Sequence, residues 1–243
     1  MEKLKKIYAD SEDQLFSILK LIEVKMPART KGRKTEHTEI WSICHMLSTY
    51  SENNFLQYPI ALENRDKPDF QLQLNTNDIG IEFTEAIPEQ YAWALVLRDK
   101  YFPNSNITPS LFRWGSPKRS RKEILRILKA SKNKLIGPPL VGDSVEMEWS
   151  VGMWDCIVSK LDKLNKKRFK KYYSNWLLIY DNLPSTLLNF SKASDYLNEK
   201  LIHYWDGFPG YEYTFDHILI ECRKNFLIIN SKGTKFLKTC NIW

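Results

Sequence analysis

Polar and hydrophobic residues alternate from Ile79 to Thr84, which is the pattern of a β-strand buried on one face. The apolar residues of this run point to one side of a sheet, and Glu82 points to the other. The polar stretch 75–78 is typical of a turn, and the residues before it predict a second strand that starts at Asp69. The pattern therefore predicts a β-hairpin that carries Asp69 and Glu82 on neighbouring strands.

Other segments repeat hydrophobic residues at steps of three and four, the spacing of an amphipathic helix. Helices are expected over residues 1–24, 36–50, 88–97, 118–134, 149–173 and 185–201. Further strands are expected over residues 55–62, 175–181, 215–222 and 225–230. Thr35 is the expected N-cap of the second helix, and the helix from Pro88 should pack against the sheet. This mixture of elements predicts an α/β protein in which the apolar run 175–181 forms a central strand.

The composition indicates a folded protein with a basic surface. Of the 243 residues, 43% are hydrophobic and 13% are aromatic, which is enough for a large core. Lysine and arginine total 36 against 29 aspartate and glutamate, giving a formal net charge of +7. Because neutralised phosphates release their counterions, this charge favours nucleic acid as a partner without requiring it.

The cysteines and the apolar runs bear on the compartment. The four cysteines, at positions 44, 156, 222 and 240, form no C-x-x-C pair and have no matching histidine spacing. This argues against a zinc site or a disulfide framework and favours reduced thiols. No stretch reaches the roughly 18 apolar residues of a membrane span, and the charged N-terminus lacks the apolar region of a signal peptide. We therefore expect a cytoplasmic protein without a membrane partner.

The two acids of the hairpin suggest a metal site. Carboxylates on paired strands provide oxygen ligands for a hard divalent cation such as Mg²⁺, which can activate water beside a phosphodiester. The alternative is that Asp69 belongs to a turn and Glu82 to an exposed strand surface, where acids are common. Spacing alone does not decide between these interpretations.

The order of acids along the chain is more specific. Glu39 lies in an expected helix, Pro68–Asp69 opens the hairpin, and Glu82-Phe83-Thr84 follows on its second strand before another helix. This order resembles the PD-(D/E)XK nuclease superfamily, which has the restriction-endonuclease-like fold. The resemblance covers roughly residues 36–90 and implies a mixed central sheet flanked by helices. We then expect one nuclease-like domain over residues 1–243, with an N-terminal helix and basic connector in 1–34 and a basic helical insertion in 101–148.

The resemblance also implies roles for these residues. Asp69, Glu82 and the carbonyl of Phe83 would hold Mg²⁺ or Mn²⁺, and a helix acid would assist. Glu39 is preferred over Glu36 for that acid, although both also suit the first turn of a helix. Thr84 occupies the place of the family's lysine and cannot carry a positive charge. Water activation would then fall on the metal, on a lysine from elsewhere in the chain, or on nothing.

Glu85, Glu89 and Gln90 lie near the start of the following helix, and one of them could compensate for the missing lysine, Gln90 by orienting water. Acids and amides at a helix start are more often explained by the helix dipole.

Two basic segments are candidates for contact with nucleic acid. The first lies with Phe112 and Trp114 and comprises Arg113, Lys118, Arg119, Arg121 and Lys122. Its cations suit phosphates and its rings suit bases or sugars, but a solvated helix entry explains it equally well. The second belongs to the lysine-rich run 160–171 and includes Lys166, Lys167 and Arg168. It would follow a phosphate backbone if it lay beside the acids, and is otherwise a solvated helix end.

The leading hypothesis is a metal-dependent nuclease that acts on DNA in preference to RNA. The alternatives are a catalytically inactive nucleic-acid-binding module of the same fold and a protein-interaction component of a larger assembly, for instance in a defence or mobile-element system. A protein partner or a homodimer is compatible with each of these.

Overall fold

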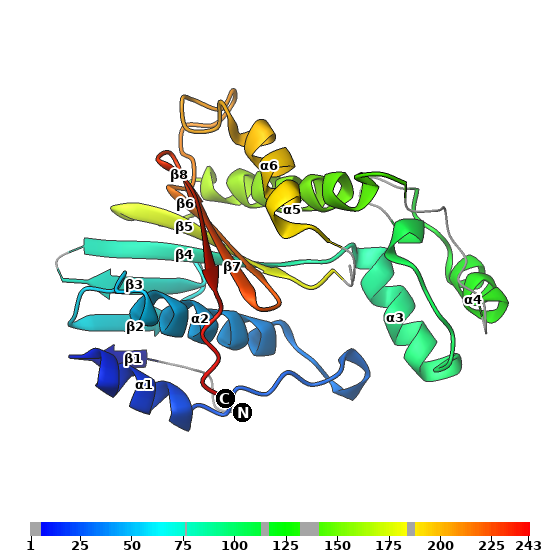
Figure 1. Cartoon of the computed structure of the whole chain (residues 1–243), viewed down its shortest axis with the longest axis horizontal. Helices are drawn as coiled ribbons and strands as arrows, with labels where there is room; N and C mark the ends of the chain where they lie inside the picture. The colour runs from blue at the N-terminus through cyan, green and yellow to red at the C-terminus, as the bar shows by residue number, and fades with distance from the viewer. Residues whose placement is uncertain (1–5, 76, 113–116, 132–140, 184–187) are drawn as a thin grey trace.

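The computed structural model of the protein describes residues 6–75, 77–112, 117–131, 141–183 and 188–243 (Figure 1). Within these residues the chain forms one eight-stranded sheet whose strands follow each other in chain order. The strands are β1 (Lys6–Ala9), β2 (Ile60–Asn64), β3 (Phe70–Leu74), β4 (Asn77–Ala86), β5 (Ser174–Asp181), β6 (His217–Cys222), β7 (Asn225–Asn230) and β8 (Gly233–Lys238). Strands β4, β5 and β6 are parallel, and the remaining neighbours are antiparallel. The expected mixed α/β sheet is confirmed.

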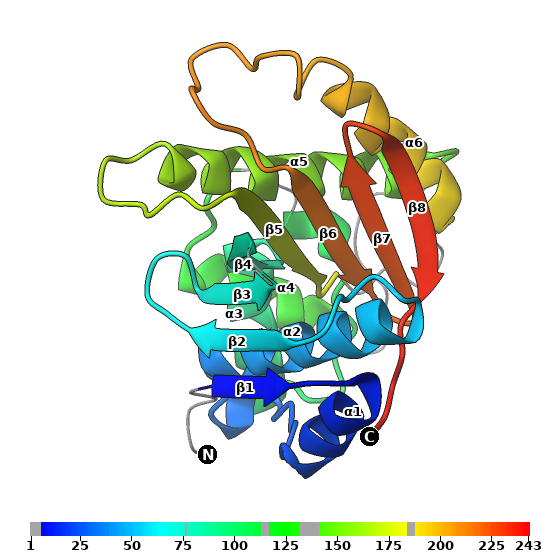
Figure 2. The same ribbon diagram turned by 90° about the vertical axis from the view of Figure 1, so that its left-hand side faces the viewer.

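Helices cover both faces of this sheet (Figures 1 and 2). The apolar sides of α1 (Glu12–Leu21) and α2 (Thr35–Glu52) pack on one face, and those of α5 (Ser144–Leu164) and α6 (Phe190–Leu201) on the other. Strand β5 contributes to the hydrophobic core on each face of the sheet, because its side chains alternate between the two faces. Leu178 faces α2, and Leu177 faces α5. A strand buried on both faces gains little from polar residues, which is why 175–181 is an apolar run.

Strand β4 shows the predicted alternation. Ile79, Ile81 and Phe83 belong to the core beneath α2. Glu82 therefore faces the opposite side, toward α5. It is only 4% exposed, so the alternative of an exposed strand position is wrong.

A third cluster of buried hydrophobic residues, besides the cores on the two faces, lies beside the sheet and not on it. Helices α3 (Glu89–Tyr101) and α4 (Arg121–Ala130) pack against each other and against a short 3₁₀ helix, Pro109–Phe112. The buried residues Tyr91, Ala94 and Leu97 of α3 belong to this cluster. The expectation that this helix packs its apolar side on the sheet is therefore wrong. Part of the expected insertion 101–148 belongs to this unit.

The N-terminal half differs from the sequence expectation at three places. The segment expected as one helix over 1–24 contains strand β1 before α1, because the short run Lys6–Ala9 alternates between exposed and buried residues. Lys34 is the N-cap of α2, and its amide donates to Nδ1 of His37. Thr35 is instead the first residue of that helix. The strand expected over 55–62 occupies Ile60–Asn64, after the cis peptide Tyr58–Pro59.

The C-terminal half differs at the ends of α5, at the start of α6, which is Phe190 instead of 185, and in one further strand. Helix α5 begins at Ser144 and ends at Leu164, where the side chain of Asn165 donates to the carbonyl of Leu161. The basic residues after 165 therefore follow the helix instead of continuing it to 173. The ending of the chain also contains a strand, β8, that sequence analysis missed, although the hairpin of β6 and β7 is confirmed.

Candidate functional site

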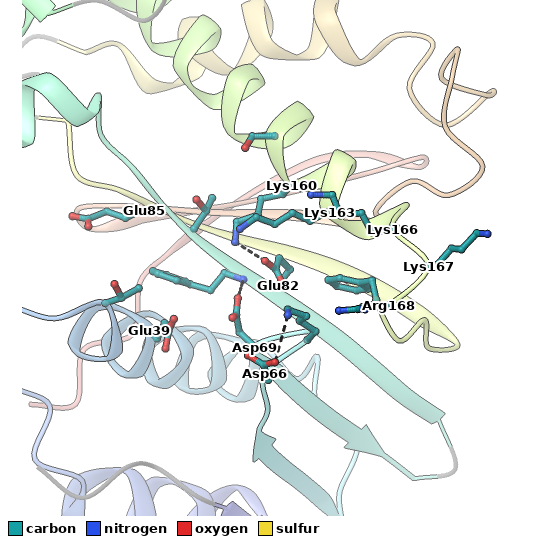
Figure 3. A pocket seen from close by; sticks show the side chains of 16 residues that line it. Glu39, Asp66, Asp69, Glu82, Glu85, Lys160, Lys163, Lys166, Lys167 and Arg168 are labelled. Atoms are coloured by element: carbon teal, nitrogen blue, oxygen red, sulfur yellow. Dashed lines mark hydrogen bonds and ion pairs between the residues drawn. The ribbon is translucent and has the colours of Figure 1, made fainter. Parts of the chain in front are cut away.

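Strand β4 is twice as long as its neighbour β3, and this difference creates a site. Pairing between them stops at Phe70 and Ile81, while β4 continues to Ala86. The residues beyond Ile81 therefore have no backbone partner on that side, and the N-terminal end of α2 and the C-terminal end of α5 enclose the space next to them (Figure 3). The result is a pocket of about 650 Å³, here called the acidic pocket.

The lining of the acidic pocket combines acids from the sheet side with lysines from α5 and the turn after it. The lining residues are Thr35, Glu39, Asp66, Lys67, Asp69, Glu82, Phe83, Thr84, Glu85, Ser159, Lys160, Lys163, Lys166, Lys167, Arg168 and Phe169. A volume of this size suits part of a polymeric ligand or a small molecule.

Asp69 is held at the unpaired edge of β4. Its Oδ2 accepts a hydrogen bond from the Phe83 amide at 2.7 Å, which satisfies a strand N–H that β3 does not reach. Burial, followed by repulsion from Glu82, raises the pKa of Asp69 to about 7, although the Phe83 amide and Lys160 act in the opposite direction. Glu39 raises it further. The Asp69 carboxyl therefore takes up a proton near neutral pH unless another positive charge replaces that proton.

Glu82 has a partner that the sequence does not reveal. Nζ of Lys160, on α5, lies 2.5 Å from Oε1 of Glu82, and the Lys160 and Glu82 side chains are only 12% and 6% exposed. Figure 3 shows the Lys160 side chain directed from α5 toward the two acids. Separating a buried ion pair leaves an uncompensated charge and is costly in free energy. This contact therefore holds both side chains in place.

Lys160 thus brings an ammonium to the acids, where Thr84 supplies none. Thr84 lines the pocket on β4, and its neighbour in the adjacent strand is Ile179. Lys163, one turn further along α5, has its pKa lowered by burial and by the charge of Lys160. Sequence analysis named Lys160 only as the start of a basic run. Its separation of 78 residues from Glu82 gives no local signal of the contact.

Glu39 and Glu36 lie at the start of α2, but they relate differently to the acids. Glu39 lines the acidic pocket and acts electrostatically on Asp69, whereas Glu36 is exposed and does not line that pocket. Both border a smaller neighbouring hollow together with Asp69. Of these two acids, Glu39 is therefore the one whose charge raises the pKa of Asp69, and it is also the preferred helix acid.

Glu85 and Gln90 have structural partners. Glu85 pairs with Arg29 and accepts from the side chain of Asn182, and Figure 3 shows it apart from Asp69 and Glu82. The side-chain amide of Gln90 donates to the carbonyl of Arg119 and accepts from its amide. Gln90 does not line the acidic pocket, so the hypothesis that it orients water there is wrong.

The two basic segments fall in different places. Lys166, Lys167 and Arg168 line the acidic pocket (Figure 3). Lys118, Arg119, Arg121 and Lys122 lie at the start of α4, and none of them lines it. Arg113 lies outside the described residues.

A hard divalent ion needs oxygen ligands from carboxylates, carbonyls or water. Among the residues that the structure describes, no group of three or more His, Cys, Asp or Glu side chains is arranged to hold a metal. The pocket instead offers one pair of neighbouring carboxylates, in which burial and then the charge of Glu82 raise the pKa of Asp69. Mg²⁺ is commonly bound by one or two carboxylates while keeping several waters, so an oxygen pair of this kind fits it better than a closed protein cage.

No helix in the described part of the chain is long and apolar enough to cross a membrane. Comparisons with protein-family models, with curated proteins and with solved structures find no match to the chain.

Proposed function

We propose that the protein is a metal-dependent nuclease of the PD-(D/E)XK type that hydrolyses phosphodiester bonds of nucleic acid in the acidic pocket. One observation carries the proposal: a buried lysine contacts one of two neighbouring buried carboxylates, in a pocket that further cations also line. Acid, lysine and phosphate-binding groups are the components that such chemistry needs. The restriction-endonuclease-like form of the α/β fold is part of the same proposal.

Asp69 and Glu82 would hold Mg²⁺ or Mn²⁺, with the Phe83 carbonyl as a further oxygen ligand. When bound, the ion lowers the pKa of a water ligand and offsets charge on the phosphodiester. The raised pKa of Asp69 supports this assignment, because a carboxyl that repels its neighbour is stabilised by a cation in place of a proton.

Lys160 would take the role of the lysine that Thr84 does not provide. Its ammonium, held by Glu82 at 2.5 Å, would orient a water molecule or stabilise negative charge at the reacting phosphate. Its position on helix α5 favours this role, because a group on a regular element is held more precisely than one on a loop. Glu39, on the opposite wall, adds negative charge beside Asp69.

Lys163, Lys166, Lys167 and Arg168 would bind the phosphates that flank the cleaved bond. They line the same pocket as the acids, so one strand of nucleic acid can contact both groups. DNA is the preferred substrate in this proposal, in a setting such as a defence or mobile-element system.

Cleavage assays test the proposal directly. Plasmid, linear and single-stranded DNA and RNA are incubated with Mg²⁺ or Mn²⁺ and with wild-type, Asp69→Ala or Glu82→Ala protein. We expect metal-dependent cleavage by the wild type and loss of cleavage in both variants. Absence of cleavage of every substrate, or equal cleavage by the variants, would contradict the proposal.

A module that binds nucleic acid without cutting it is the second candidate. The Lys160–Glu82 contact favours it, because an acid that is fully neutralised by lysine needs no cation. Such a module would retain salt-dependent binding but show no metal-dependent cleavage. A protein-interaction role would be favoured only if binding is absent at low salt.

A further inference from the structure

A second pocket lies at the opposite end of β3 from the acidic pocket. It has a volume of about 520 Å³ and is here called the aromatic pocket. Its lining includes the side chains of Tyr50, Phe55, Trp176, His217, Lys232 and Lys235. Asp69 borders one pocket and Leu74 the other, which separates them by roughly 17 Å along the strand.

Aromatic rings line the aromatic pocket, and one pair of them is stacked. Trp176 and His217 are parallel to within 29°, with ring centroids 4.8 Å apart. Tyr50 contacts both Trp176, at 5.6 Å, and Phe55, at 5.4 Å between centroids. Flat apolar walls of this kind favour a planar ligand, because every nucleobase offers a π-face for stacking.

Two polar atoms in these walls have no partner within the described part of the protein. The Oη of Tyr50 and the Nδ1 of His217 are both buried and make no hydrogen bond. Tyr50 is only 3% exposed. Buried polar atoms are nearly always paired, and both of these belong to side chains that line the aromatic pocket, so a ligand whose binding uncovers them would gain two hydrogen bonds.

The mouth of the aromatic pocket is cationic. Lys232 and Lys235 line it from the turn between β7 and β8 and from β8 itself. Nζ of Lys235 lies 4.2 Å from the centre of the Phe55 ring, which places an ammonium directly beside an aromatic wall. An anionic group attached to a planar ring can therefore contact these lysines while the ring lies among the aromatic side chains.

We propose that the aromatic pocket binds a nucleobase together with its phosphate, as the nucleotide-binding site of this protein. The rings stack on the base, Tyr50 Oη–H and the His217 ring nitrogen bond to its heteroatoms, and Lys232 and Lys235 contact the phosphate. The same chemistry is present in a free mononucleotide and in the terminal nucleotide of a strand. The proposal does not depend on cleavage chemistry in the acidic pocket.

Calorimetric titration distinguishes the parts of the ligand. AMP, GMP, CMP and UMP are compared with the corresponding nucleosides and with inorganic phosphate. At least one nucleotide should bind saturably and more tightly than either its nucleoside or phosphate. A 5′-phosphorylated oligonucleotide that competes with the mononucleotide would identify a strand end as the source, whereas failure to compete would identify the free nucleotide.

Tyr50→Phe is the sharpest variant, because it removes an oxygen that has no partner in the protein. The folded state should keep or gain stability, since no protein hydrogen bond is lost. Nucleotide affinity should nevertheless fall by about fivefold. A structural role for Tyr50 alone would leave the affinity unchanged.

Two more variants and their controls complete the test. Phe55→Ala should weaken nucleotide binding by about tenfold through lost stacking, and Lys235→Ala should weaken nucleotide but not nucleoside binding. Lys238→Ala, on the same strand but outside the pocket, and Glu89→Gln, exposed beside Lys118 and outside both pockets, should bind nucleotide as the wild type does. Absence of binding by every nucleotide, or unchanged affinity in Tyr50→Phe, Phe55→Ala and Lys235→Ala, would overturn the proposal.

Discussion

Two basic segments of similar composition have different neighbours in this protein. At the start of α4, Lys118 lies 3.7 Å from Glu89 with both side chains more than 80% exposed, and Arg121 donates to the hydroxyl of Tyr101. After α5, Lys166, Lys167 and Arg168 line a pocket that contains Asp69 and Glu82. The first segment is explained by local contacts on the surface. The second segment lines the same pocket as the acids.

The difference shows that the tertiary position of a charge run decides which groups it lies beside. Exposed ion pairs contribute little and are screened by salt. Lys160, by contrast, pairs with Glu82 in a buried and less polar environment, where each charge has a larger effect on its neighbours. The raised pKa of Asp69 is one result of that environment.

The largest expected effect is on the cleavage rate, and it distinguishes Lys160 from the other lysines of the pocket. Lys160→Met should reduce the cleavage rate by about 100-fold or more, because the group that orients water or stabilises charge is lost. Nucleic-acid affinity should change by less than about twofold, since other cations line the pocket. Single-turnover cleavage and equilibrium binding measure the two quantities.

Lys163→Met is the matched control, because it removes a lysine from the same helix face without breaking the Glu82 contact. Circular dichroism is needed for both variants, since Lys160→Met leaves Glu82 buried without its partner. Cleavage by folded Lys160→Met at the rate of Lys163→Met would remove Lys160 from the mechanism.

The second prediction compares the basic segments directly. Replacing Lys166, Lys167 and Arg168 together by alanine should weaken nucleic-acid binding by about tenfold and reduce the salt slope by about 2–3. The triple replacement of Lys118, Arg121 and Lys122 should change affinity by less than about twofold, because these residues lie outside the pocket. Binding titrations at several salt concentrations measure both. A larger loss in the second triple variant would reverse the assignment.

The third prediction concerns pH. The pKa of Asp69 is about 7 in the folded protein against 3.8 as the ordinary value. At pH values between these two pKa values, the folded state holds a proton that the unfolded chain has released. The contribution of Asp69 to stability is therefore full below pH 4 and is lost as the pH rises through 7.

Asp69→Asn removes this titration but keeps an oxygen that can accept from the Phe83 amide. Above pH 7 the variant should be more stable than the wild type by about 1–2 kcal/mol, and near pH 4 the difference should disappear. Urea denaturation at both pH values measures it. A difference that does not depend on pH would mean that Asp69 titrates normally.

The smallest effect tests how the second basic segment is placed. A Cβ added at Gly80 would lie 2.6 Å from the ring of Tyr172, which hydrogen-bonds to Gln71 and lies beneath Lys170. Gly80→Ala should destabilise the fold by about 1–2 kcal/mol and weaken nucleic-acid binding by about twofold, because the ring and its segment must shift. Thermal denaturation and binding titration check this. Unchanged affinity in a destabilised variant would show that the shift does not reach Lys166–Arg168.

The sequence predicted the local parts of this site. Alternation along β4 correctly indicated that Glu82 faces away from Ile81 and Phe83, because a strand period of two depends only on nearby residues. The apolar run of β5 likewise indicated its central place. Strand β1 was missed because four residues carry too little periodicity to be distinguished from a helix.

The contacts between elements that are distant in the chain could not be predicted from the sequence. Lys160 reaches Glu82 only because α5 crosses β4, and no periodic pattern encodes that crossing. The Gln90 contact with Arg119 similarly depends on how α3 and α4 pack. The end of α5 was placed too late because lysines continue after Asn165 without any proline or glycine to mark the boundary.

The most direct test of the acidic pair is a calorimetric titration with Mn²⁺ near neutral pH. We expect saturable binding to the wild type, with loss of binding in both Asp69→Asn and Glu82→Gln and no change in Glu89→Gln, whose acid is exposed beside Lys118. Wild-type protein that binds no Mn²⁺, or acidic-pocket variants that bind it unchanged, would contradict the assignment of this pocket as a site for a divalent cation.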